Sequence, residues 1–452
     1  MQFLTLALIL ACTLGTFFTD VGAAPAALKF LPEGLSLIAL AYILLAGSRQ
    51  RFQLVAPRYW LAFGALALVV LCGVLINRPG PGTLIGGMRF YLRAMPFFFL
   101  PAVCEFSETQ LRSQLRLLLG IALVQLPVSV YQRYQVMAHG HWSGDPVTGT
   151  LLISSVMSIF LIAATCIAAA LMLRGRLSKT AFLALFLLFA VPTTINETKS
   201  TVLLLPLGLL TTLLIGSPRG RRLRFSISAL ALLALFAALY VPVYDYFASA
   251  NNPYPYTVES FFSDRRAVVR YVDQGTDLGS RREAGRWDAL VVPLQTFASD
   301  PVHLVFGVGV GNGSASSLGI GYTGEYNGLF GRYTIETSAA AFIVEIGVLG
   351  LALVLWLYWL ILRDSLSVAT HDRTIVGAVA LGWLGVTLVM AVATFYKSLH
   401  YFESLSYLFW YFSGLVAAQS VRLGLQQRSA PISAVTPRLS PRADRTAARA
   451  QP

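Results

Sequence analysis

Arginines and carboxylates are the side chains in this sequence whose types and spacing could do chemistry. The arginines gather between Arg265 and Arg286, and the relevant carboxylates are Glu336 and Glu345, beside and inside a long apolar run. Guanidinium groups bind phosphate oxygens in pairs, and a carboxylate that is partly removed from water can serve as a base. Such a set would suit a lipid-linked diphosphate.

Two groups of these arginines have helical spacing. Arg265, Arg266 and Arg270 are spaced for one helical face, and so are Arg282 and Arg286, which stand four residues apart. The alternative is a solvated helix whose arginines pair with nearby acids, because surface ion pairs contribute little and are common. The acids available for such pairs are Asp264, Asp273, Glu283 and Asp288.

The stretch FGVGVGNGSASSLG, from Phe306 to Gly319, contains alternate glycines. A dinucleotide-binding turn needs a third glycine after two intervening residues and an acidic residue about 20 positions later, and the spacing here fails. Glycine permits tight turns and close approach of the backbone. We therefore expect Gly307, Gly309 and Gly311 to let the loop turn tightly, with simple loop flexibility as the alternative.

Three charged residues stand at or inside apolar runs. Lys199 precedes one run, and Glu336 opens a later run that buries Glu345 about two and a half turns further on. A carboxylate inside a membrane helix is costly unless it is paired, so it is a functional candidate. Glu345 could instead be a structural hydrogen-bond partner, and Lys199 could simply extend its ammonium group to the membrane surface. No His or Asp cluster has ligand spacing, so we expect no metal and no cofactor.

The elements that must position these residues are membrane helices. The chain is 56% hydrophobic and only 12% charged, with a mean hydropathy of +0.67. About 12 apolar runs are long enough to cross a bilayer as helices, which predicts an all-α, polytopic membrane protein. The predicted spans are 2–19, 31–47, 59–76, 86–104, 115–132, 151–173, 180–195, 200–216, 225–244, 336–361, 374–396 and 402–420.

Arginine and lysine fall in every second short connection, which assigns those connections and both termini to the cytoplasm. The long segment 245–335 between spans nine and ten then lies on the extracytoplasmic side of the membrane. We divide the chain into spans one to nine (1–244), this loop (245–335), spans ten to twelve (336–420) and a disordered cytoplasmic tail (421–452). The connections and the tail account for much of the +13 charge, so nucleic acid is not expected as a partner.

The first apolar run and the four cysteines are both explained as parts of membrane helices. The first apolar run lacks a positively charged start, which favours a retained helix over a cleaved signal peptide. The four cysteines lie inside apolar runs without paired spacing, so they predict buried small side chains and not a disulfide framework or a zinc site. They are Cys12, Cys72, Cys104 and Cys166.

Two stretches resemble the outer-loop motifs of the O-antigen ligase and polymerase family. They are GRWDALVVPLQTFASDPVHLVFGVGVGNG and, about 20 residues later, ETSAAAFIVEIGVLGLALVL. Members of that family have about 12 spans and a large outer loop between the ninth and tenth, as predicted here. The resemblance implies a bacterial inner-membrane enzyme whose partner molecule is a polyprenyl-diphosphate-linked oligosaccharide, working in the lipid bilayer beside a flippase and a chain-length regulator.

The resemblance also implies roles for individual residues. Glu336 stands where ligases carry histidine, which makes it the expected base, and Lys199 stands where the family usually has arginine. Arg282 and Arg286 are rivals for one diphosphate contact, with Arg265, Arg266, Arg270 and the three glycines as further substrate-binding residues. These departures favour a polysaccharide polymerase, with an O-antigen ligase as the alternative within the family. A transporter or channel is the competing class, because its ionisable residues would line a pathway.

Overall fold

The computed structural model describes residues 1–47, 49–139, 146–218, 220, 222–251, 257–258, 263, 277–278, 281–282, 284–316 and 318–429. The predicted contribution of Arg265, Arg266 and Arg270, and the predicted disorder of residues 430–452, lie outside these residues.

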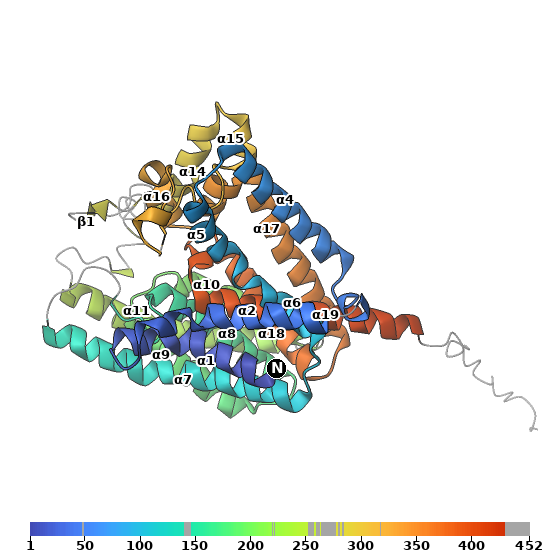
Figure 1. Cartoon of the computed structure of the whole chain (residues 1–452). Coiled ribbons are helices and arrows are strands. Elements are labelled where there is room, and N and C mark those ends of the chain that lie inside the picture. Colours follow the sequence, from blue (N-terminus) through green and yellow to red (C-terminus); the bar gives the residue numbers. More distant parts are fainter. Residues whose placement is uncertain are drawn as a thin grey trace, which may run out of the picture.

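The first half of the described chain is entirely helical (Figure 1). Its helices follow one another through short connections, as expected for a polytopic membrane protein. They are α1 (Gln2–Asp20), η1 (Ala26–Phe30), α2 (Leu31–Ala46), α3 (Arg49–Phe52), α4 (Pro57–Asn77), α5 (Pro81–Leu92), α6 (Met95–Val103), α7 (Glu108–His139), α8 (Ser154–Leu173), α9 (Lys179–Ile195), α10 (Thr201–Gly216) and α11 (Arg222–Asn251).

The second half adds one very short antiparallel ladder, in which Asp277 pairs with Arg282, and is otherwise helical. The all-α class is therefore confirmed apart from this two-residue pairing. Its elements are β1 (Asp277–Leu278), β2 (Arg281–Arg282), α14 (Arg286–Phe297), α15 (Pro301–Phe306), η4 (Ile320–Tyr322), α16 (Asn327–Thr334), α17 (Ser338–His371), α18 (Ile375–Ala393), η5 (Leu399–Tyr401) and α19 (Glu403–Ser429).

Eight helices in the described part of the chain are long and apolar enough to cross a membrane, which supports a multi-pass membrane protein. Two further predicted spans, α9 and α10, are apolar but shorter, at 17 and 16 residues. The predicted twelfth span falls in α19, which is not among the eight. A total of about 12 spans therefore stays a prediction.

The predicted fourth span, 86–104, is not one helix. It divides into α5 and α6 at Arg93 and Ala94. Pro96 explains the division, because proline has no amide proton and its ring clashes with the carbonyl four residues earlier, so it is favoured in the first turn of a new helix. Two predicted boundaries also shift: α11 continues to Asn251 and α19 to Ser429, past the expected ends at 244 and 420.

The centre of the bundle is formed by α8 and α18. In each of them 83% of the most apolar stretch is buried, against 28% in α4. Small residues allow close approach, since Gly382 packs on the backbone of Cys166 and Ile167 in α8, and Gly385 packs on Gly208 in α10. Close contact between small residues is a usual way for membrane helices to associate.

The first helix is joined to the bundle by a buried chain of hydrogen bonds. The Gln114 amide of α7 donates to the Thr5 hydroxyl of α1, at 2.9 Å, and the Tyr411 hydroxyl of α19 donates to the Gln114 carbonyl oxygen, at 2.8 Å. These three side chains are almost inaccessible to solvent. The contact fixes α1, α7 and α19 in one register because each buried polar group has its partner.

Charged residues from the predicted cytoplasmic connections meet at one end of the bundle. Arg58 and the Tyr59 hydroxyl both bind the Asp364 carboxylate, at 2.5 and 2.9 Å. Arg176 pairs with Glu108, and so connects the ends of α8 and α7. The structure thus groups these residues on one side; which side faces the cytoplasm stays a prediction.

The helices of the predicted outer loop form a small subdomain at the top of Figure 1, where α14, α15 and α16 lie around the ends of α4, α5 and α17. It has its own hydrophobic cluster, separate from the main core, which includes Phe297, Val308, Phe330 and Val344. Because Val344 belongs to α17, burial of apolar area in this cluster holds the subdomain against a bundle helix.

Candidate functional site

A break in α17 organises the end of the protein that carries the α14–α16 subdomain. Gly347 has a φ of 69° and a ψ of 179°, which interrupts the helix after nine residues. Every residue from Ser338 to Gly347 is buried, so this first segment of α17 is covered on all sides. A helix break leaves carbonyl groups without their usual partners, and inside a membrane protein these must be satisfied by other groups.

The glycine-rich segment supplies those partners. The Val308 amide donates to the Val344 carbonyl at 2.7 Å, and the Gly309 amide donates to the Glu345 carbonyl at 3.1 Å. The Asn312 side chain then holds the segment in shape, since its amide donates to the Val308 carbonyl and its oxygen accepts from the Glu325 amide. Residues 307–312 therefore bind the carbonyl groups at the break in α17, and we call this segment the clasp.

The three predicted substrate-binding glycines are buried in this clasp. Gly307, Gly309 and Gly311 all have positive φ, between 71° and 91°. A Cβ atom on Gly307 would lie 2.4 Å from the Glu345 carbonyl carbon, and one on Gly311 would lie 2.4 Å from the Thr83 oxygen. Backbone conformation and close packing against α5 and α17 account for glycine at these positions, and a role beside a sugar or diphosphate stays a prediction.

Glu345 lies directly beneath the clasp and is 2% exposed. Its Oε2 accepts a hydrogen bond of 3.0 Å from the Tyr91 hydroxyl of α5. The Ser314 hydroxyl and the backbone amides of Gly311 and Gly313, in the glycine-rich segment, also lie against this carboxylate. The carboxylate thus joins α5, α17 and the glycine-rich segment, and its structural role stays a prediction.

Glu336 lies in the turn between α16 and α17, not in the helix itself. Thr337 caps α17 with its hydroxyl, and Glu336 precedes it with only 6% of its surface exposed. The expected base is therefore more completely buried than a residue at an open membrane surface. The next two amides are bound to a distant segment: Ser338 and Ala339 donate to the Lys397 and Thr394 carbonyls, at 3.1 and 2.9 Å.

His400 supports the same turn from the other side. Its Nδ1 lies 3.0 Å from the Ser338 hydroxyl. Burial, together with the positive charge of Arg93, lowers the pKa of His400 to about 3, so the ring is neutral at physiological pH. Sequence reasoning did not select this histidine, because it is distant from Glu336 in the chain.

Arg286 reaches the segment that covers this turn. Its guanidinium lies 5.4 Å from the centre of the Tyr396 ring, over the face of the ring. Tyr396 directly precedes Lys397, whose carbonyl binds Ser338. The structure therefore brings Arg286 and Glu336 to adjoining segments, although they are 50 positions apart in the sequence.

The predicted shared helical face of Arg282 and Arg286 is wrong. Arg282 belongs to the strand β2, whereas Arg286 is the first residue of α14. Gly285 separates them in an extended conformation, with φ −65° and ψ 154°, and forms the N-terminal cap of the helix. Two arginines on either side of such a cap cannot have the i, i+4 relation of a continuous helix.

Lys199 lies at the level of the same turn. Gly208 of α10 packs on Val389 of α18, and Gly216 packs on Leu381, so the two helices run antiparallel. The beginning of α10 lies about 10 Å from Gly208 along the helix axis, and the same distance along α18 from Val389 leads to the C-terminal end of α18, near Ala393. Lys199, which precedes α10, is thus at the end of the bundle that carries Arg286 and Glu336.

The structure adds a partly buried ion pair that sequence reasoning missed. Arg133 of α7 binds Glu197 at 2.5 Å, and its guanidinium lies 4.3 Å from the centre of the Phe247 ring. Glu197 has a φ of 61°, an uncommon conformation for a residue other than glycine. Residues held in such conformations cluster at functional sites, so this pair is a further candidate.

Several polar atoms around this pair are buried without a hydrogen-bond partner among the described residues. In native proteins such atoms are rare, and a concentration of them indicates a place where water or a polar ligand is bound. They are Arg133 Nη1, Ser155 Oγ, Thr198 Oγ1, Ser200 Oγ and Thr201 Oγ1.

A signal for Arg133 was present in the sequence. Gln125, Ser129 and Arg133 follow one another at intervals of four, so they place a polar stripe on one face of an otherwise apolar helix. All three are buried in the structure. Intramembrane polar residues on one face usually point to the interior of a bundle.

Comparison with known proteins does not assign a family. Neither a protein-family model nor a curated protein sequence matches this chain. The resemblance to O-antigen ligases and polymerases therefore stays a hypothesis that is based on motifs and layout. In the residues that the structure describes, no three His, Cys, Asp or Glu side chains group together as metal ligands would, and metal independence also stays a prediction.

Proposed function

We propose that this protein is a membrane glycosyltransferase that uses a polyprenyl-diphosphate-linked glycan, and that it polymerises the repeat units of an exported polysaccharide. The observation that carries the proposal is the meeting of unlike groups at one end of the bundle. A buried carboxylate, Glu336, lies in a turn that adjoins Arg286, and Lys199 is at the same level. Acid–base chemistry and diphosphate binding need these two kinds of group together.

In the proposed reaction, an acceptor sugar hydroxyl attacks the anomeric carbon of the lipid-linked glycan. The new carbon–oxygen bond forms as the bond to the diphosphate oxygen breaks, and polyprenyl diphosphate leaves. Glu336 accepts the hydroxyl proton, and Arg286 and Lys199 stabilise the negative charge that develops on the leaving diphosphate. Arg282 is the alternative to Arg286 for the contact with the diphosphate. A buried site would strengthen the attraction between these cations and the diphosphate, because water screens it less there.

The unpaired polar atoms near Lys199 support a glycan as the ligand. A sugar presents many hydroxyl groups, each of which donates and accepts a hydrogen bond. The serine and threonine hydroxyls that follow Glu197, together with Arg133 Nη1, are buried without partners among the described residues. Leaving such groups unsatisfied costs free energy, which a polyhydroxylated ligand would recover by binding them.

A strain that lacks the gene tests this function in the cell. Loss of a polymerase leaves single repeat units on the carrier, whereas loss of an O-antigen ligase leaves full-length polymer on its carrier and none on lipid A–core. Lipid-linked glycans are extracted and sized in the deletion strain and in a strain complemented with the wild-type gene. Normal polymer length together with normal attachment would refute both assignments.

A transporter or channel is tested separately. The ion pair between Arg133 and Glu197 is the observation that favours it, since paired charges within membrane helices also occur along transport pathways. Purified protein in liposomes is assayed for solute flux without any lipid-linked sugar. Flux that is lost in Glu197→Gln, with no glycan transfer by the wild type, would replace the proposed function by transport.

A further inference from the structure

The turn that joins α9 to α10 is held by side chains from three other helices. The Asn196 side chain donates to the Ser154 carbonyl of α8 at 3.0 Å, and the Tyr240 hydroxyl of α11 donates to the Thr198 carbonyl at 2.9 Å. The Arg133 guanidinium of α7 donates to a carbonyl at the beginning of the turn. The turn is therefore surrounded by α7, α8 and α11 at the point where α10 begins.

The helices α8 and α10 run parallel and begin at the same level. Gly208 of α10 packs on Ile162 of α8, and Gly216, later in α10, packs on Leu173, later in α8. Both helices begin about 10 Å before the first of these contacts. The first residues of α8 and α10 are therefore neighbours, on either side of the turn.

Five buried polar groups lie around this turn, and we call them the polar cluster. They have no hydrogen-bond partner among the described residues, and each residue is at most 7% exposed. Arg133 is fixed in place, because its Nε donates to the Ile195 carbonyl at 3.1 Å and its Nη2 binds Glu197. Nη1 is therefore held with its donors unused. The five groups are Arg133 Nη1 and the hydroxyls of Ser155, Thr198, Ser200 and Thr201.

The hydrogen-bonding character of the polar cluster fits an uncharged sugar better than an anion. Arg133 and Glu197 lie 2.5 Å apart, so their charges offset each other, and an anion at Nη1 would meet the Glu197 carboxylate. A sugar hydroxyl both donates and accepts. Neighbouring hydroxyls of one sugar can therefore accept from Nη1 and donate to Glu197, whose side chain is 15% exposed and reaches the surface.

We propose that the polar cluster binds the sugar that is joined directly to the diphosphate, and that it selects an uncharged sugar with neighbouring free hydroxyl groups. Lys199, for which we propose the diphosphate contact, stands between Thr198 and Ser200 in the chain. The sugar at the anomeric linkage is the part of the substrate next to the diphosphate, and so next to these hydroxyls. This inference rests on the proposed function and adds the recognition of the sugar to it.

Binding of synthetic lipids to the purified full-length protein in detergent, measured by isothermal titration calorimetry, tests the proposal. The lipids are geranylgeranyl diphosphate alone and the same lipid carrying glucose, galactose, N-acetylglucosamine or glucuronic acid. We expect at least one of the three neutral glycosyl lipids to bind about tenfold or more tightly than geranylgeranyl diphosphate alone. The glucuronic acid lipid should bind no more tightly than geranylgeranyl diphosphate alone, because its carboxylate meets Glu197.

Thr201→Val removes one hydroxyl of the polar cluster and keeps the shape of the side chain. The Thr201 hydroxyl has no partner among the described residues, so the variant should unfold at the temperature of the wild type. It should bind the neutral glycosyl lipid about three- to tenfold more weakly, through loss of one hydrogen bond, and geranylgeranyl diphosphate as tightly as before.

Thr212→Val is the matched control in the same helix. Thr212 is as completely buried as Thr201, but its hydroxyl donates to the Gly208 carbonyl at 3.0 Å. The control should therefore leave lipid binding unchanged, and any effect should be on the unfolding temperature.

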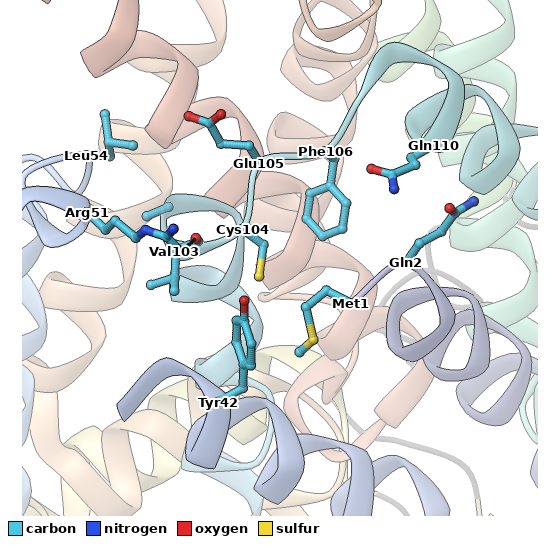
Figure 2. A pocket seen from close by; sticks show the side chains of 11 residues that line it. Met1, Gln2, Tyr42, Arg51, Leu54, Val103, Cys104, Glu105, Phe106 and Gln110 are labelled. Carbon is cyan, nitrogen blue, oxygen red and sulfur yellow. Dashed lines mark hydrogen bonds between the residues drawn. The ribbon is translucent and has the colours of Figure 1, made fainter. Parts of the chain in front are cut away.

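A polar cavity elsewhere in the protein provides a second control (Figure 2). It has a volume of about 540 Å³, and none of the residues of the polar cluster lines it. Gln2→Leu changes the lining of that cavity and should leave binding of the neutral glycosyl lipid unchanged. Weaker binding in Gln2→Leu and not in Thr201→Val would assign the sugar to that cavity and overturn the proposal.

Failure of this inference is distinguishable from failure of the proposed function. If no lipid binds, including geranylgeranyl diphosphate, the proposed function fails and the sugar site fails with it. If geranylgeranyl diphosphate binds but no neutral sugar strengthens its binding, or if Thr201→Val binds the neutral glycosyl lipid as tightly as the wild type, the sugar site alone is refuted. Tightest binding of the glucuronic acid lipid would refute the selection of an uncharged sugar.

Discussion

Replacement of Gly311 by alanine tests whether the glycine-rich segment is a packing element. Gly311 has a φ of 80°, and a left-handed conformation costs an L residue about 1–2 kcal/mol. The new Cβ would also lie 2.4 Å from the Thr83 oxygen and 2.9 Å from the Gly87 Cα. Both are backbone atoms, so they cannot rotate away, and relief of such a clash costs about 1–3 kcal/mol more. We expect the free energy of unfolding to fall by about 2–5 kcal/mol in total.

Two other glycines separate these contributions. Gly319 has a φ of 116° but no atom within 4 Å of an added Cβ, so Gly319→Ala carries only the conformational cost. Gly321 has open space and no positive φ, so Gly321→Ala should leave stability almost unchanged. The expected order of destabilisation is Gly311→Ala first, Gly319→Ala second and Gly321→Ala last.

The assay is thermal unfolding of each purified variant in detergent, followed by glycan transfer per amount of folded protein. A packing role predicts that Gly311→Ala lowers the midpoint most and that the folded fraction keeps its specific activity. If Gly311→Ala unfolds at the same midpoint temperature as the wild type, Gly311 does not have a packing role. Normal stability with lost activity would instead return Gly311 to the substrate site.

The remaining predictions concern the charged residues. Glu336→Gln keeps size and hydrogen bonding but cannot accept a proton, so the transfer rate should fall about 100-fold or more at equal protein level. Arg286→Lys should weaken donor binding, measured as a raised KM, because lysine has no bidentate fork; the same change at Arg282 decides between the rivals. Glu345→Gln should lower the amount of membrane-inserted protein more than the specific activity. The pKa of His400 is about 3 in the folded protein and 6.5 in the unfolded chain, so protonation favours unfolding between these values. The free energy of unfolding should therefore be unaffected by this group above pH 6.5 and should fall by at most about 1.4 kcal/mol per pH unit as the pH drops towards 3. His400→Gln should flatten this dependence, measured as Tm against pH.

The class of the protein could be predicted from the sequence because bilayer thickness sets a length for apolar runs. The length of the apolar runs did not predict where helices break, because a break can depend on contacts with a segment that is distant in the sequence. Pro96 and the preceding turn divide one predicted span, and α17 breaks at Gly347 in a run that looks continuous. The break depends on the clasp, since Gly347 packs on the Val305 carbonyl, a contact that no local pattern contains.

In the candidate site too, the local sequence predicted which residues matter but not which distant segments they contact. Glu336 could be selected from its position at the start of an apolar run, but its burial depends on the carbonyls that end α18. The cap at Gly285 explains why arginines four residues apart do not share a face. Arg133 was overlooked because a single arginine near the end of a long helix resembles an interfacial residue, and its partner Glu197 lies in the distant connection between α9 and α10.

The central claim is formation of a glycosidic bond from a lipid-linked diphosphate, and reconstitution measures it most directly. Purified protein in proteoliposomes receives the lipid-linked glycan that is extracted from the deletion strain. We expect a ladder of products that differ by one repeat unit, with one polyprenyl diphosphate released for each bond, and a rate at least about 100-fold lower for Glu336→Gln, as for loss of a base. Folded wild-type protein that forms no new glycosidic bond with this substrate would contradict the account.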